Sequence, residues 1–86
     1  MILKMFCVRD RATDQFGNPM FLISEGQAIR SFSDEVNRDD KTNQLWSHPD
    51  DFDLFYLGEF DTQTAAFAPV VPPAQAAIGK SVKIRS

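Results

Sequence analysis

The stretch that decides the fold is Ser47-His48-Pro49-Asp50-Asp51-Phe52-Asp53-Leu54-Phe55-Tyr56-Leu57-Gly58-Glu59-Phe60-Asp61-Thr62-Gln63-Thr64-Ala65-Ala66-Phe67. Residues 52–61 place apolar side chains or glycine at every even position, which predicts a strand whose even side faces a helix. Residues 61–64 are polar and begin with Asp, which favours a hairpin turn. Residues 65–71 are expected to return as the last strand, and Pro69 places that strand at an edge of the sheet.

The odd side of this strand is polar at its ends and apolar at its centre, where Phe55 and Leu57 stand. We therefore predict that Phe55 and Leu57 form a contact face, with core or dimer packing as their simplest use. Aromatic residues on a sheet also stack single-stranded bases. Because Phe55 and Tyr56 point to opposite sides of the strand, at most one of them could do so.

Upstream, residues 2–8 are apolar on both sides and predict a first strand. Residues 10–17 are expected to form a loop, with Phe16 anchored on the core. A short apolar run at 20–23 predicts the second strand. Ser24-Glu25-Gly26-Gln27 is a capping box, which predicts the start of a helix over residues 25–37. Its apolar face is expected to consist of Ala28, Ile29, Phe32 and Val36.

These elements predict an α+β fold. We expect a small antiparallel sheet of about four strands, in the order strand–strand–helix–strand–strand, with one helix packed on one face. Residues 1–71 should form a single domain. Residues 72–77 are rich in Pro and Ala and predict a linker. Residues 78–86 are expected to be a flexible basic tail that could add a strand to a partner sheet.

The chain has 86 residues, which corresponds to one domain with a modest core. Cys7 is the only cysteine, so an intrachain disulfide is excluded and a buried thiol is expected. No apolar run approaches the length of a transmembrane helix, and the first residues are too soon interrupted by charge to be a signal peptide. We therefore expect a soluble protein without a membrane partner. Dimerisation is a common remedy for so small a core.

The net charge of −3 is unevenly distributed, because ten of the twelve acidic residues fall within residues 24–61 and the basic residues cluster towards the two ends. This pattern excludes a uniformly basic nucleic-acid binder. It leaves open a local phosphate-binding patch built from the ends, although ordinary solubilising charge explains the same residues. The candidate nucleic-acid-binding residues are Lys4, Arg9, Arg11, Lys80, Lys83 and Arg85.

The sequence contains no motif for catalysis or cofactor binding. One His and one Cys without paired spacing predict no metal site, and phosphate-binding loops and nucleophile elbows are absent. The acidic groups Asp39-Asp40 and Asp50-Asp51-Asp53 could suggest a two-metal nuclease. We interpret them instead as solvated loops and strand-end residues. The chain is therefore expected not to be an enzyme and to need no cofactor.

Three segments carry a resemblance: Gly26-Gln27-Ala28-Ile29-Arg30-Ser31-Phe32-Ser33-Asp34-Glu35-Val36-Asn37, residues 47–55, and Leu57-Gly58-Glu59-Phe60-Asp61. Together they resemble the small nonstructural protein of microviruses, the gokushovirus-like single-stranded DNA phages, over residues 1 to about 70. The resemblance implies a nonstructural or DNA-binding protein of the host bacterial cytoplasm that acts in single-stranded genome synthesis or its coupling to packaging. It implies no catalytic residues.

Two functions therefore stand open. The first is a non-catalytic phage accessory protein that binds single-stranded DNA through its basic ends, as a homodimer or higher homo-oligomer. The second is a protein-interaction module that contacts the phage replication protein, the procapsid or a host factor through Phe55, Leu57 and the last strand.

Overall fold

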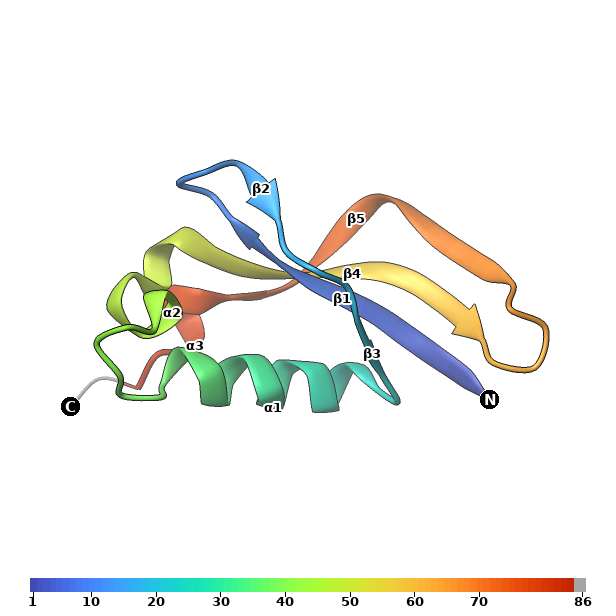
Figure 1. Cartoon of the computed structure of the whole chain (residues 1–86), viewed down its shortest axis with the longest axis horizontal. Helices are drawn as coiled ribbons and strands as arrows, with labels where there is room; N and C mark the ends of the chain where they lie inside the picture. Colours follow the sequence, from blue (N-terminus) through green and yellow to red (C-terminus); the bar gives the residue numbers. More distant parts are fainter. Residues whose placement is uncertain (85–86) are drawn as a thin grey trace.

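The computed structural model describes residues 1–84, and Arg85 lies outside the described residues. An antiparallel sheet of order β2-β1-β4-β5, with β3 also paired to β1, carries one longer helix along one side and short helices gathered at one end (Figure 1). This confirms the predicted α+β class. The elements are β1 (Ile2–Asp10), β2 (Gln15–Phe16), β3 (Met20–Leu22), α1 (Glu25–Val36), α2 (Gln44–Ser47), η1 (Pro49–Asp51), β4 (Phe52–Asp61), β5 (Phe67–Ile78) and α3 (Gly79–Val82).

Helix α1 begins where the capping box predicts. The Ser24 hydroxyl accepts a hydrogen bond from the Gln27 N–H at 3.2 Å, and the Gln27 side chain accepts one from the Ile23 N–H at 3.1 Å. The Gln27 side chain thus reaches one residue further back than in the usual box. The first bond satisfies a backbone donor that the first helical turn leaves free, and the second satisfies the N–H of the residue before the cap.

The core lies between α1 and one face of the sheet. Ala28, Phe32 and Val36 from α1 are buried, and they meet side chains of β1 and β4 on the other side of the core. Phe6 is fully buried there, and its ring lies 5.2 Å from that of Tyr56. The predicted helix-facing side of β4 is confirmed for its first half, whose members are Phe52, Leu54 and Tyr56.

A β-bulge changes the pattern in the second half of β4. Met5 pairs with Gly58 and Phe6 pairs with Tyr56, so Leu57 is an extra residue. One extra residue reverses which parity faces which side. Phe60 pairs with Leu3 and therefore lies on the side away from α1. The prediction that every even position of β4 faces the helix is wrong at Phe60.

The C-terminal segment from residue 72 onward differs from the expected linker and tail. Strand β5 does not end at residue 71 but continues to Ile78, and α3 follows it directly. The Asn37 side chain fixes this segment, because its amide donates to the Val82 carbonyl at 2.9 Å and its oxygen accepts from the Ile84 N–H at 2.7 Å. Residues 72–84 are thus part of the folded unit.

Figure 1 shows a two-layer arrangement, with α1 running along one side of the curled sheet. Strand β5 bows away from β4 on the side opposite α1, where four residues of β5 stand opposite the bulge at Leu57. The β2 turn rises on that same side. Within residues 1–84, Figure 1 shows no helix on this side of the sheet.

Candidate interaction surfaces

The side of the sheet that faces away from α1 is called the open face here. Side chains of paired residues in antiparallel strands share a face, so the register assigns its members. Phe55 pairs with Cys7, Phe60 with Leu3 and Phe67 with Phe60. From the edge strands, Phe16 pairs with Arg9 and Phe21 pairs with Met5. The phenylalanines of the open face are Phe16, Phe21, Phe55, Phe60 and Phe67.

These rings form two groups along the sheet. Phe16 and Phe55 meet edge to face with centroids 5.4 Å apart. At the other end, Phe60 lies 5.7 Å from Phe21 and 5.3 Å from Phe67, so this group spans β3, β4 and β5. Such separations are typical of favourable aromatic pairs. The two groups leave exposed rings on both ends of one sheet face.

Exposure of these rings is high for phenylalanine. Phe16 is 51 % exposed, Phe21 47 % and Phe67 65 %, whereas Met5 and Cys7 at the centre of the same face are nearly inaccessible. Burial raises the pKa of the Cys7 thiol. The expectation of a buried cysteine is therefore confirmed, and the expectation that Phe16 anchors on the core is wrong.

The predicted contact residues Phe55 and Leu57 are both partly exposed. Phe55 lies on the open face, and strand alternation from Phe55 directs Leu57 to the same side. Neither residue belongs to the core between the sheet and α1. The structure thus brings them together with four further phenylalanines of the open face. Three of these, Phe16, Phe21 and Phe67, lie in β2, β3 and β5, whose faces could not be assigned from sequence periodicity.

The backbone beside Leu57 depends on the absence of a side chain at Gly58. Its φ is +139°, and a Cβ atom there would lie 2.3 Å from the carbonyl oxygen of Ala68. Glycine tolerates both conditions, and no other residue does. Gly58 therefore permits the bulge that directs Phe60 to the open face.

The basic residues of the N-terminal strand are in part engaged with acids. Arg9 forms an ion pair with Asp14, and Arg11 Nε lies 3.2 Å from Asp53 Oδ2. Asp53 is only 3 % exposed, and its second oxygen has no hydrogen-bond partner among the described residues. Arg9 stands opposite Asp53 in the strand register, but the ion pair of this buried carboxylate is with Arg11.

The remaining predicted DNA-binding residues have different surroundings. Lys83 donates to the Trp46 carbonyl at 3.2 Å and the Val36 carbonyl at 3.4 Å, and its ammonium lies 4.7 Å from the centre of the Trp46 ring. Lys80 is exposed on α3. Lys4 lies on the α1 side, 6.0 Å from the Tyr56 ring and opposite Glu59. Within residues 1–84, neither Lys4 nor Lys80 forms an ion pair.

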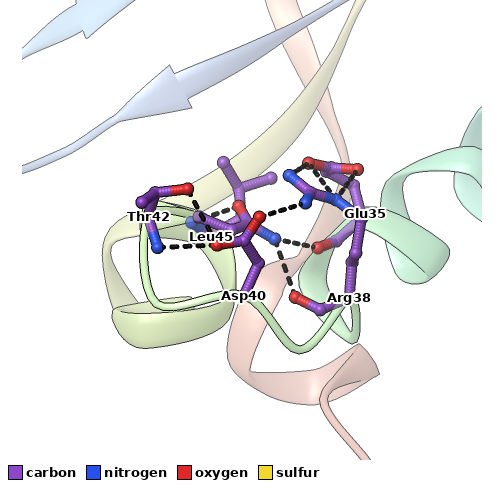
Figure 2. Close-up of polar contacts among 6 residues, drawn as sticks. Glu35, Arg38, Asp40, Thr42 and Leu45 are labelled. Atoms are coloured by element: carbon purple, nitrogen blue, oxygen red, sulfur yellow. Dashed lines mark hydrogen bonds and ion pairs between the residues drawn. The ribbon is translucent and has the colours of Figure 1, made fainter.

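A polar corner joins the end of α1 to α2 (Figure 2). Asn43 is 5 % exposed, and its amide donates to the carbonyls of Glu35 at 2.8 Å and Arg38 at 3.1 Å. Arg38 bridges Glu35 and Asp40 at the surface. A hydrogen bond donated by the Arg38 side chain lowers the pKa of Glu35. The pKa of Asp40 is lowered mainly by a hydrogen bond from the backbone N–H of Thr42. Both acids have structural partners, and Asp40 is a loop residue, in agreement with its interpretation.

Within residues 1–84, His, Cys, Asp and Glu side chains form no group of three that could hold a metal ion. None of the helices in that range is long and apolar enough to cross a membrane. The single histidine, His48, is exposed in the turn before η1. The open face and the basic residues remain the candidate functional surfaces.

Comparison with known proteins identifies the family. The model of the family described as "Phage ORF5 protein" matches residues 3–84. The chain belongs to the Phage ORF5 family. The chain is also similar to "Protein ORF5" of Chlamydia phage 1, with 36 % identity over 67 residues that cover 76 % of this chain and 70 % of that protein. No solved structure matches.

Membership in the Phage ORF5 family confirms the resemblance to small phage proteins of the microvirus group. The match extends to residue 84, so β5 and α3 belong to the family pattern, whereas the resemblance taken from the sequence ended near residue 70. This agrees with the folded C-terminal segment.

Proposed function

We propose that this Phage ORF5 protein is a non-catalytic accessory protein of the single-stranded DNA phage cycle, associated with genome synthesis or packaging in the host cytoplasm, and that it acts through protein contacts of the open face. The observation that carries the proposal is the exposure of Phe16, Phe21 and Phe67 on the side of the sheet that faces away from α1. Apolar patches of this kind on soluble proteins usually mark interaction sites.

The chemistry of the open face favours a protein over a phosphate backbone as its partner. The charged residues at its border, Arg9 and Asp53, are both matched by ion pairs within the chain. Phosphate binding requires cations that are free to replace counterions. Binding to an apolar protein surface does not require free cations, and aromatic side chains are enriched in protein–protein interfaces.

The test uses immobilised protein and two purified probes, the replication initiation protein and the procapsid of the same phage. We expect the wild type to retain at least one probe and Leu57→Glu to lose it, because the new carboxylate would be buried without a partner. Ile84→Glu is the matched control, since Ile84 is 74 % exposed beside α1 and away from the open face. Equal retention by wild type and Leu57→Glu would argue against the open face.

A second candidate function is association with single-stranded DNA. The Arg9 guanidinium lies 5.8 Å from the centre of the Phe16 ring, next to Phe55, so that a phosphate which displaces Asp14 from Arg9 would lie beside two rings of the kind on which bases stack. Lys4 and Lys80 add cations without acidic partners among residues 1–84. We expect weak binding through few phosphates.

Fluorescence anisotropy with a labelled thymidine oligonucleotide of about 20 residues tests this function at roughly 50 and 200 mM salt. Binding by the basic residues should weaken with salt and should weaken further in Lys4→Ala/Lys80→Ala. Phe16→Ala should reduce affinity without changing the salt dependence, because stacking releases no counterions. The absence of binding at low salt would remove DNA as a direct partner.

A further inference from the structure

We infer that the open face is covered by the open face of a second copy of this chain, so that two sheets pack face to face and the two α1 helices lie outside. This inference rests on the proposed function in taking the open face as the contact surface. It names a second copy of the chain as the occupant that a phage protein probe must displace.

A single chain is more extended, and exposes more surface, than a compact monomer of the same size. The radius of gyration is 13.4 Å, compared with about 12 Å for a compact chain of this length. The accessible surface is 5704 Å², compared with roughly 5,100 Å² for a compact monomer of 9.7 kDa. Both differences are those expected of a sheet that has a helix on one side only.

The area of the open face suits a dimer. The molecule measures 44 × 23 × 20 Å, and Figure 1 shows the layers stacked along the intermediate axis. A rectangle with the longest and shortest of these dimensions has an area of roughly 900 Å², which is an upper bound for the open face and leaves room for the ~800 Å² that each partner buries in an interface of standard size.

The charges and the edges of the sheet point to the same geometry. A second copy brings an apolar face whose border charges are already paired, so no unpaired charge is buried on either side. Extension of the sheet through β5 is disfavoured, because Pro69, Pro72 and Pro73 interrupt the first half of its free edge. Dimerisation through the open face is therefore favoured over pairing of the β5 edges. Two sheets that pack face to face lie about 10 Å apart.

The test measures molar mass by light scattering on a sizing column over a wide concentration range. We expect the wild type at twice 9.7 kDa. Phe67→Glu and Leu57→Glu should shift it to a single chain with an unchanged circular dichroism spectrum, whereas Ile84→Glu should leave the dimer intact. A wild type that is monomeric at every concentration would overturn the inference, as would a dimer that survives both open-face variants.

The same column run with a single-stranded oligonucleotide separates the alternative occupants. A monomer that binds the oligonucleotide and loses it in Phe67→Glu would show that a nucleic acid covers the face, and this would overturn the inference. Failure of probe capture by a wild-type protein that is dimeric through the open face contradicts the proposed function alone. Probe capture by a monomer, lost in Leu57→Glu, contradicts the dimer alone.

Discussion

Replacement of Lys83 by Met separates a structural role of this lysine from the DNA-binding role predicted for it. The Lys83 ammonium donates to the carbonyls of Trp46 and Val36, and it lies above the Trp46 ring. Val36 is the last residue of α1, whose carbonyl end attracts a positive charge. Met keeps a side chain of similar length over the ring and removes the charge and both hydrogen bonds.

The expected loss of unfolding free energy follows from these contacts. Hydrogen bonds to charged groups contribute up to about 3 kcal/mol when short and buried. Those of Lys83 measure 3.2 and 3.4 Å and are partly solvated, so their contribution is smaller. With the cation–π contact and the helix dipole, we expect a loss of about 1–2 kcal/mol. For a domain of this size that loss lowers the melting temperature by roughly 5–15 °C.

Urea unfolding followed by Trp46 fluorescence measures this loss, and oligonucleotide anisotropy measures binding in the same samples. Lys80→Met is the matched control, because Lys80 is exposed and should change stability by less than about 0.5 kcal/mol. We expect Lys83→Met to lower stability and to leave any DNA affinity as in the wild type. A Lys83→Met protein with wild-type stability and weakened DNA binding would refute the structural role.

Three further predictions follow from the same contacts. Asn43→Ala removes two donated hydrogen bonds and the cap of α2. We expect the free energy of unfolding, measured in urea, to fall by about 2–3 kcal/mol. A decrease below about 0.5 kcal/mol would contradict this structural role of Asn43. Gly58→Ala places a Cβ against a β5 carbonyl at positive φ, and we expect at least about 2 kcal/mol of destabilisation together with loss of the dimer. Because the pKa values of Glu35 and Asp40 are lowered in the folded protein, their stabilisation is complete above about pH 5 and is lost as the pH falls below about 4. Melting curves from pH 3 to 7 should show this decline, and Arg38→Ala should reduce it.

Structural partners account for several residues of the acidic centre of the chain. Several acids have structural partners: Asp40 binds the backbone of Thr42, Glu35 binds Arg38, and Asp53 is held by Arg11. These contacts account for acidic groups that could otherwise suggest a nuclease.

Local sequence patterns determined most of the elements. The strands β1 and β4, the start of α1 at Ser24 and its buried face were all predictable, because alternation, capping and helical spacing depend on neighbouring residues. The odd-side pair Phe55 and Leu57 was predictable for the same reason. The α+β class follows from the order of these elements.

Tertiary structure decided the rest. The bulge at Leu57 depends on pairing with a distant strand, and it alone transfers Phe60 to the open face. Residues 72–84 lack a local signal, since their order comes from pairing with β4 and from the Asn37 side chain. Periodicity within one segment cannot report such contacts. Residues 47–67 therefore specified a strand and a turn by themselves, whereas the assembly of five phenylalanines on one uncovered face required the whole sheet.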